Sequence, residues 1–357
     1  MASANAGPGD VVAVRDGRGR LLGSALYSSA SEIALRLISP SVIEAEAWPG
    51  LVRQRTAQAL QYRERMVRDS DACRLVFSES DALPGLIVDR YNDVLSFQVL
   101  TQGMDRETVR SAILETLVER LAPAGVVERV DARIRALEKL PPVQDHLVKG
   151  EKTTTLFTMN GVRFHYEALA GQKTGAFLDQ RENYAAAARY ARGEALDVFC
   201  YQGGFALHLA RVCGGVTAVD SSRPALEAAE RNEELNRASL KVAEIEWIEA
   251  NAFDLLKDYA AGGRQFDTII LDPPPFARTR RTVAQALRGY KEINLRALKM
   301  LRPGGLLVTC SCSFHVSEAE FLEMLAAAAQ DAHRSLRILE KRGQPADHPV
   351  LLGIPET

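Results

Sequence analysis

The stretch Asp197-Val198-Phe199-Cys200-Tyr201-Gln202-Gly203-Gly204-Phe205 decides the fold of the C-terminal half of the chain. It reads as a strand that ends in a tight glycine turn, and the turn opens a helix. Glycines let the backbone approach a ligand closely, and a helix N-terminus adds hydrogen-bond donors. The stretch lacks the Gly-x-Gly-x-x-Gly spacing of dinucleotide-binding turns. By itself it fits a glycine needed for packing as well as it fits a ligand site.

Strands and helices alternate around this stretch, from about residue 170 onward. We expect strands at 195–199, 216–220, 244–249, 266–271 and 305–310, and helices at 204–213, 223–236, 252–260, 281–301 and 317–330. Such repeats predict a parallel sheet with helices on both faces, and ligands of these folds bind at the carboxyl ends of the strands. The fold class expected for this part is therefore Rossmann-like α/β.

Two smaller modules are expected before residue 170. Residues 9–40 carry short apolar runs with turns at hairpin spacing, and residues 50–70 have helical periodicity. Strands are expected near 74–78, 85–89, 94–100, 126–130 and 155–167, with a helix at 105–121, as a β-β-α-β-β unit. We therefore predict a multidomain chain, with a small β domain and linker helix at 1–70, an α+β domain at 71–169 and the α/β domain at 170–357.

Composition restricts the partners only weakly. The 357 residues carry a formal net charge of −2, whereas a nucleic-acid enzyme usually has a basic surface. The arginines nevertheless cluster, at Arg53, Arg55, Arg63, Arg65 and Arg68 in the helical stretch and at Arg278, Arg280 and Arg281 further on. The first cluster would bind phosphates, or else form a solvated helix face that bridges two domains.

The five cysteines show neither a disulfide framework nor a zinc-finger spacing, so we expect no metal and a reducing, cytoplasmic location. No apolar run approaches the roughly 20 residues of a membrane-spanning helix. The first residues lack the basic and apolar regions of a signal peptide. Membrane association is therefore not expected.

Polar side chains stand at the ends of the other expected strands. Asp220 can accept hydrogen bonds from two ribose hydroxyls or cap the next helix, and Asn251 with Phe253 can meet an adenine. Asp272 opens an Asp-Pro-Pro-Pro-Phe segment, whose prolines hold a rigid loop over the sheet edge. Because no phosphate-binding triple-glycine turn is present, this set favours S-adenosylmethionine over a nicotinamide cofactor.

The last expected strand runs into two cysteines, Cys310 and Cys312. Methylation at a pyrimidine carbon needs a nucleophile from the protein, because a thiolate that adds to C6 makes C5 reactive. Cys312 follows the strand far enough to project into the cleft, whereas Cys310 is expected to pack as a small apolar residue. A buried structural cysteine is the alternative at either position.

Five segments of the chain carry a family resemblance. They are Asp81–Tyr91, Gly171–Arg181, Asp197–Phe205, Asp272–Phe276 and Thr309–Ser313, within a similarity that runs from about residue 9 to the end. The chain resembles bacterial class I 23S rRNA methyltransferases with an N-terminal PUA domain, of the cytosine-C5 type. The resemblance implies a PUA-like RNA-binding domain, a central α+β domain and a class I methyltransferase domain. The chain departs from the family in a shorter N-terminal module and at Asn251, where an aspartate is common.

The strand ends and the resemblance together predict three sets of site residues. The catalytic residues are Cys312 and Asp272, and Asp272 is expected to hold the cytosine edge. The S-adenosylmethionine residues at the strand ends are Asp197, Phe199, Tyr201, Gly203, Phe205, Asp220, Ser221, Asn251, Ala252, Phe253 and Asp272. The resemblance further implies Lys173, Thr174, Phe177 and Gln180, in a segment that by itself reads only as a polar loop before a helix. The residues for an extruded base are Pro273, Pro274, Phe276 and Arg278. His315 is left out, because a histidine beside a helix start is more often solvated or a cap.

The expected reaction is S-adenosylmethionine-dependent formation of 5-methylcytosine in 23S rRNA, through a covalent bond between Cys312 and C6 of the base. One alternative on the same scaffold is methylation of a guanine ring nitrogen, which needs no thiol. Another is a non-catalytic RNA-binding or ribosome-assembly factor. The sequence leaves open the target nucleotide, the base that removes the C5 proton, the choice between naked rRNA and an assembling large subunit, and whether the protein forms a homodimer.

Overall fold

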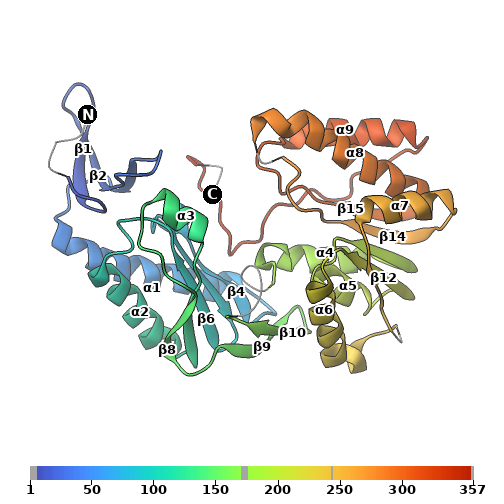
Figure 1. Cartoon of the computed structure of the whole chain (residues 1–357), viewed down its shortest axis with the longest axis horizontal. Coiled ribbons are helices and arrows are strands. Elements are labelled where there is room, and N and C mark those ends of the chain that lie inside the picture. The colour runs from blue at the N-terminus through green and yellow to red at the C-terminus, as the bar shows by residue number, and fades with distance from the viewer. Residues whose placement is uncertain (1–5, 170–175, 243, 278, 355–357) are drawn as a thin grey trace. The chain divides into compact units, whose positions relative to one another are not determined.

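The computed structural model describes residues 6–169, 176–242, 244–277 and 279–354 (Figure 1). The chain packs as two compact units. The first comprises Met1–Gly161, His165–Asp179 and Gln344–Thr357, and the second comprises Val162–Phe164 and Gln180–Gly343. The N-terminal sheet and the central module lie together in the first unit, so the division into three domains remains a prediction.

The N-terminal sheet of the first unit has three antiparallel strands, β1 (Val11–Arg15), β2 (Leu21–Tyr27) and β3 (Leu35–Ser39), in the order β1-β2-β3. Asp16 shapes the first turn, because its carboxylate accepts the backbone N–H groups of Arg18 and Arg20, both at 2.9 Å. The expected small β module is therefore present.

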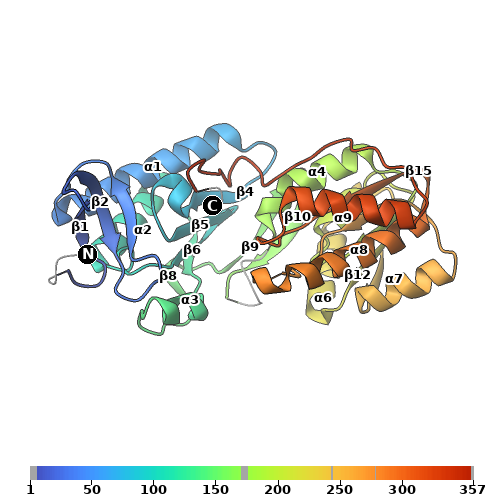
Figure 2. The ribbon, with the colours of Figure 1, turned by 90° about the horizontal axis from the view of Figure 1, so that it is seen from above.

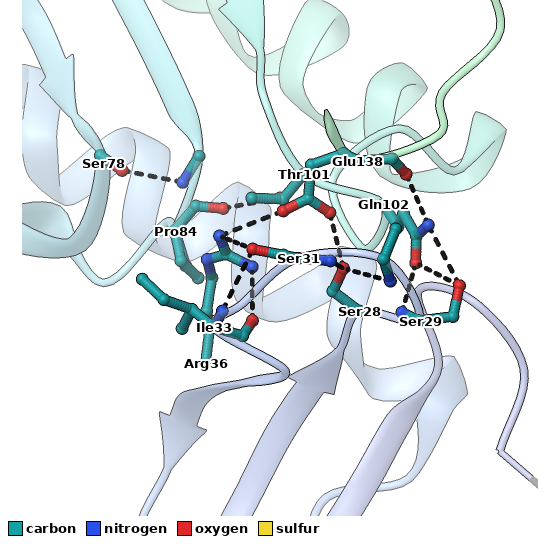
Figure 3. A network of polar contacts seen from close by, with 12 residues as sticks. Ser28, Ser29, Ser31, Ile33, Arg36, Ser78, Pro84, Thr101, Gln102 and Glu138 are labelled. Carbon is teal, nitrogen blue, oxygen red and sulfur yellow. Dashed lines mark hydrogen bonds and ion pairs between the residues drawn. The ribbon is translucent and has the colours of Figure 1, made fainter. Parts of the chain in front are cut away.

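A polar network joins this sheet to the central module (Figure 3). Glu138 is 2% exposed, and its carboxylate accepts the Ser28 hydroxyl at 2.8 Å and pairs with Arg36 at 3.1 Å. Gln102 donates its amide nitrogen to the Glu138 carbonyl at 2.6 Å and accepts the backbone N–H of Ser29 at 3.0 Å. Because each buried group shown has a partner, the network fixes the sheet on the module without an unpaired charge.

The central module is a five-stranded sheet covered on one face by two helices (Figures 1 and 2). The sheet has the order β4-β5-β6-β7-β8, and α1 packs against α2 over it. The bounds are α1 (Trp48–Met66), β4 (Ala72–Phe77), β5 (Leu86–Tyr91), β6 (Val94–Val99), α2 (Glu107–Leu121), β7 (Gly125–Glu128), α3 (Ala132–Leu137) and β8 (His146–Gly150). The core consists of the apolar faces of the two helices and the strands.

The single strand expected at 155–167 is wrong. The segment is a separate two-stranded hairpin, β9 (Thr154–Met159) and β10 (Val162–Glu167), and the fifth strand of the central sheet is β8. The hairpin turns at Asn160 and Gly161, which both have positive φ, at 52° and 78°. Asn-Gly is the usual two-residue hairpin turn, so the sequence contained the signal that splits the run.

Arg63, which the sequence placed in a polar helix face, is instead buried in the first unit. Its side chain is 1% exposed, and its guanidinium forms an ion pair with Asp81. The same guanidinium donates to the backbone carbonyl of Asp347 at 3.0 Å, in the segment that returns from the second unit. The Asp347 carboxylate is fully buried and accepts the backbone N–H of Arg74 at 2.9 Å. Residues near 347 therefore pack on the first unit, although the sequence assigned them to the C-terminal domain.

The other four arginines of the cluster, three in α1 and Arg68 just after it, divide into two kinds. Arg53 pairs with Glu115 of α2, and Arg55 donates to two backbone carbonyls. Arg65 and Arg68 are exposed. The five arginines thus form neither one phosphate-binding surface nor one solvated face, and three of them hold the first unit together.

The second unit is a parallel sheet with helices on both faces, as predicted. The sheet has the order β13-β12-β11-β14-β15. Its strands are β11 (Glu194–Val198), β12 (Gly215–Asp220), β13 (Glu246–Glu249), β14 (Phe266–Leu271) and β15 (Leu301–Thr309). The helices α4 (Arg181–Tyr190), α5 (Gly204–Leu209) and α6 (Arg223–Asn236) cover one face, and α7 (Ala252–Ala261), α8 (Val283–Met300) and α9 (Glu318–Asp331) cover the other (Figure 1). Among the described residues, no helix combines the length and the apolarity that a membrane span needs.

The order of the strands reverses between β11 and β14. The chain moves outward from β11 through β12 to β13, and then returns to place β14 on the other side of β11. In an open parallel sheet the loops on the two sides of such a point diverge and leave a crevice at the carboxyl ends of the strands. Asp197, Asp220 and Asp272 stand at the ends of β11, β12 and β14.

We expect Arg63→Ala to lower the free energy of unfolding of the first unit by about 3–5 kcal/mol, because it leaves the carboxylate of Asp81 without its buried partner. Urea unfolding followed by circular dichroism measures the change. Arg65→Ala, on the same helix but exposed, is the matched control and should change the free energy by less than about 0.5 kcal/mol. Equal effects of the two variants would contradict the structural role of Arg63.

Candidate functional site

The turn after β11 holds two non-glycine residues in the left-handed region. Phe199 has φ 69° and Tyr201 has φ 49°, and Gly203 follows with φ 83°. A Cβ on Gly203 would lie 2.8 Å from the ring of Trp247, so packing as well as conformation requires glycine there. Backbone strain at bulky residues persists only where the surroundings impose it, and it gathers at ligand sites. The surrounding structure therefore holds this turn in a strained conformation, as is common at ligand sites.

Three carboxylates meet at this edge, from Asp197, Asp220 and Asp272. Asp197 is fully buried; one carboxylate oxygen accepts the N–H of Ala206 at 2.8 Å, and Oδ1 has no partner among the described residues. Burial, and then the negative charges of Asp272 and Asp220, raise the pKa of Asp197 to about 8. The site thus has an excess of negative charge that a cationic ligand would neutralise.

Asp220 stabilises the strained turn. One carboxylate oxygen accepts the N–H of Tyr201 at 2.9 Å, and the other accepts the N–H of Ser222 at 2.9 Å. The side chain therefore supports the start of α6 by binding the N–H of Ser222, which is the N-cap residue of that helix. Each oxygen keeps a further lone pair, and the contact of Asp220 with a ribose remains a prediction. The neighbouring Ser221 is exposed.

Gln180 links the segment before α4 to the end of β14. Its amide nitrogen donates to both carboxylate oxygens of Asp272 at 3.0 Å, and its amide oxygen accepts from Asn183 at 2.6 Å. Of the other residues predicted from the same segment, Phe177 is exposed at 37%, and Lys173 and Thr174 lie outside the described residues. The link between Gln180 and Asp272 could not be foreseen from residues so distant in the sequence.

The predicted adenine contacts take structural roles as well. The amide oxygen of Asn251 caps α7, where it accepts the N–H of Phe253 at 2.9 Å. Ala252 is buried in the first turn of that helix. Phe205 is also buried, and its ring meets the ring of Tyr184 edge-on with centroids 4.7 Å apart. With its oxygen used by the helix, Asn251 retains its amide N–H groups for a ligand.

The two cysteines differ as expected. Cys312 is exposed, and its Sγ lies 3.5 Å from the carbonyl oxygen of Pro273, to which the thiol donates. Cys310 is half-buried, and burial followed by the charge of Asp272 raises the pKa of its thiol well above its usual range. Only a thiolate is a strong nucleophile, so the geometry favours Cys312 for attack on a ligand.

A buried hydroxyl that sequence reasoning missed holds the loop around Cys312. The hydroxyl of Tyr290, on α8, lies 2.8 Å from the hydroxyl of Ser313 and accepts that of Ser311 at 3.2 Å. Ser313 also accepts the backbone N–H groups of Phe276 and Ala277, both at 3.1 Å. The serines on both sides of Cys312 are thus anchored, while the cysteine between them stays exposed.

The proline loop is fixed by the same contacts. Pro273 is buried and Pro274 is exposed. Phe276 is half-buried, and its ring centroid lies 4.6 Å from that of Tyr290 and 5.8 Å from that of Phe253. These ring contacts account for the position of Phe276, and its contact with a base remains a prediction. Arg278, the other residue predicted to contact the base from this loop, lies outside the described residues. Among the residues that the structure describes, no group of His, Cys, Asp or Glu could hold a metal ion.

Comparison with known proteins identifies the fold and the ligand. A profile of the S-adenosylmethionine-dependent methyltransferase family matches residues 87–352, which is more than half of the chain. The chain belongs to this family. A PUA-like domain profile matches residues 1–40. The small N-terminal β domain and the Rossmann-like methyltransferase fold predicted from the sequence are therefore confirmed.

Curated relatives are similar to this chain over almost its whole length. Ribosomal RNA large subunit methyltransferase I of Pseudoalteromonas translucida is 36% identical, covering 98% of this chain and 88% of the relative. The protein of the same name from Photobacterium profundum is 37% identical with the same coverage. A solved S-adenosylmethionine-dependent methyltransferase from Streptococcus mutans has a TM-score of 0.79 at 20% identity, covering 98% of this chain and 88% of that one. That identity supports the fold alone.

The residues at the strand ends fit S-adenosylmethionine, the cofactor of the family. The molecule carries a sulfonium and an ammonium group. The carboxylates of Asp220 and Asp272 supply the opposite charge, and the protonated carboxyl group of Asp197 offers an oxygen that has no partner among the described residues. When bound, S-adenosylmethionine supplies an electrophilic methyl group. The methyltransferase would hold it with the strained turn after β11 and with these carboxylates, whose individual contacts remain predictions.

The hydroxyl of Tyr290 can be tested by Tyr290→Phe. We expect the free energy of unfolding of the second unit to fall by about 0.5–1.5 kcal/mol, because the substitution removes the hydrogen bonds of the Tyr290 hydroxyl to Ser313 and Ser311. Tyr259→Phe in α7 is the control, since that hydroxyl makes no hydrogen bond among the described residues. Urea unfolding of both variants gives the comparison, and equal losses would exclude the proposed anchor.

The pKa of Asp197 predicts a pH dependence. The folded chain keeps this proton up to about pH 8, whereas the unfolded chain loses it near 3.8. The free energy of unfolding should therefore decline as pH rises between these values, by at most about 1.4 kcal/mol per pH unit from this group. Asp197→Asn should flatten the decline in thermal unfolding scans from pH 5 to pH 8. Asp258→Asn, at an exposed position, should keep the slope of the unchanged protein, and a slope unaltered by Asp197→Asn would refute the assignment.

Proposed function

We propose that this methyltransferase forms 5-methylcytosine in large-subunit ribosomal RNA, with Cys312 as a covalent nucleophile. The observation that carries the proposal is the exposed thiol of Cys312, fixed beside the loop that starts at Asp272. Support for the substrate comes from curated relatives that bear the name ribosomal RNA large subunit methyltransferase I. The PUA-like match at residues 1–40 supports RNA as the partner. The rRNA proposed as substrate is 23S rRNA, either free or within an assembling large subunit. The enzyme acts either as a single chain or as a homodimer.

The proposed chemistry depends on what each side chain can do. Deprotonated Cys312 adds to C6 of the cytosine, which raises electron density at C5. C5 can then bond to the methyl carbon as the bond between that carbon and the sulfonium sulfur breaks and leaves its electron pair on sulfur. Loss of the C5 proton to a base then expels the thiolate and restores the aromatic ring. Asp272 would accept a hydrogen bond from the exocyclic amine of the cytosine, and the N–H of Gln180 holds that carboxylate in place.

The loop geometry favours covalent catalysis over the alternative on the same scaffold. A guanine ring nitrogen carries its own lone pair, so its methylation would give no reason for an exposed thiol between two anchored serines. Ser311 and Ser313 both bond to Tyr290, an arrangement that fixes the backbone of Cys312 from both sides. The membership of the chain in an enzyme family argues against a non-catalytic assembly factor.

Cys312→Ala decides between the two chemistries. We expect methyl transfer to large-subunit rRNA to fall by at least three orders of magnitude, while calorimetric binding of S-adenosylmethionine stays unchanged, because the thiol acts only on the base. Transfer of a radioactive methyl group, followed by mass spectrometry of nucleosides, measures both the rate and the product.

Cys310→Ala is the matched control, two residues away on the same loop. It should keep most of the turnover, because its thiol holds its proton and is half-buried. Undiminished 5-methylcytosine formation by Cys312→Ala would sink the covalent mechanism. Formation of a methylated guanine by the unaltered protein would sink the choice of base.

A further inference from the structure

A large aromatic side chain stands in the open beside the proposed nucleophile. Phe314 is 67% exposed, two residues after Cys312 in the loop that follows β15. Its ring meets only the edge of another ring in the described residues, that of His315, with centroids 5.0 Å apart and planes at 75°. A phenylalanine left this exposed loses the free energy that burial would give, about 1.5–3 kcal/mol. Because the ring lies two residues from Cys312, the proposed nucleophile, we look for a role of its exposure in substrate binding.

Uncompensated positive charge lies on the segment that the same loop contacts. Arg280 and Arg281 follow the proline loop, and Arg288 lies on α8; all three are exposed. No carboxylate of the described residues pairs with any of them. The acids nearest Phe314 in the sequence are engaged elsewhere, because Glu318 pairs with Lys341 and Glu320 caps α9 through Ser317. These three guanidinium groups therefore stay without a carboxylate partner among the described residues, although the whole chain is slightly acidic.

The hydrogen bonds of Ser313 bring the aromatic and basic groups together. Ser313 precedes Phe314 directly, and its hydroxyl accepts the N–H of Ala277 at 3.1 Å. Arg280 is three residues beyond Ala277, so its Cα lies within about 11 Å of the Cα of Ala277. The Thr279–Thr282 capping box then fixes the short helix that carries Arg280 and Arg281. Ser313 thus ties the loop that carries Phe314 to the segment that leads into Arg280 and Arg281.

We propose that Phe314 is a stacking platform for the nucleotide next to the target cytosine in single-stranded RNA, with Arg280, Arg281 and Arg288 as phosphate contacts. The inference rests on the function proposed above and names how the substrate is held. A thiolate adds to C6 from above or below the plane of the pyrimidine ring. The face of the target base that is turned toward this loop is therefore occupied by Cys312. Phe314 comes from the same loop and is left to stack on a neighbouring base. Stacked aromatics with adjacent arginines are the common means of binding unpaired nucleotides.

The test is binding of a short, fluorescently labelled single-stranded RNA with one central cytosine to the full chain, measured by anisotropy. The Cys312→Ala background prevents a covalent bond. Adding Phe314→Ala should weaken binding about five- to 150-fold, the range expected for loss of one base–aromatic stack. Phe314→Trp should restore it. Phe314→Leu should not, because leucine keeps an apolar side chain but has no ring.

Two comparisons separate stacking from phosphate binding. Replacing Arg280 and Arg281 by glutamine should make the plot of log affinity against log salt concentration shallower by about 1.4, since each phosphate contact on a single strand contributes about 0.7. Phe314→Ala should leave that slope unchanged. Ile338→Ala, a second exposed apolar residue of the same unit at 64% exposure, is the control and should bind RNA as the background does.

Unchanged affinity in Phe314→Ala, or full affinity in Phe314→Leu, would overturn the inference. So would equal binding of the single strand and of the same sequence in a duplex. Calorimetric binding of S-adenosylmethionine to each variant verifies folding. The outcome is independent of the reaction: loss of RNA binding in Phe314→Ala upholds the platform even if Cys312→Ala retains turnover, which would refute the covalent mechanism alone.

Discussion

The parallel pairing of β14 with β15 is the constraint on which the site depends. The register sets Leu271 opposite Thr309, and the N–H of Cys310 continues the ladder to the carbonyl of Leu271 at 2.8 Å. Two chain segments about forty residues apart in the sequence therefore leave the sheet side by side. Everything that the proposed chemistry needs, a carboxylate on one segment and a thiol on the other, follows from that register.

Electrostatics divides the edge of the sheet into two regions. Carboxylates gather where β11, β12 and β14 end, and their mutual repulsion with burial keeps a proton on Asp197. The loop that carries Phe314 is instead bonded, through Ser313, to the segment that leads into the exposed Arg280 and Arg281. The carboxylates suit a cationic methyl donor, and the arginines suit a polyanionic substrate. The enzyme must bind both molecules at the same time, in separate regions. A net charge of −2 for the chain conceals this separation.

The first unit shows how local patterns mislead when burial is unknown. Arginines at helical spacing predicted a polar surface, yet Arg63 is buried because Asp81 and a carbonyl of the C-terminal segment satisfy it. The apolar run at 155–167 predicted one strand, and the Asn-Gly turn within it makes two. For Arg63 the deciding partners are distant in the sequence, whereas the Asn-Gly turn lies inside the run that it divides.

The sequence by itself determined the alternating α/β fold, the glycine turn after Asp197 and the choice of Cys312 over Cys310 as the exposed thiol, because periodicity and strand-end chemistry are local. Only the tertiary structure decided which side chains hold the thiol loop and Asp272 in place. Tyr290 anchors the thiol loop and Gln180 holds Asp272 across long separations in the chain. Such hydrogen bonds depend on distances between elements, which packing of the whole sheet sets and no local pattern encodes.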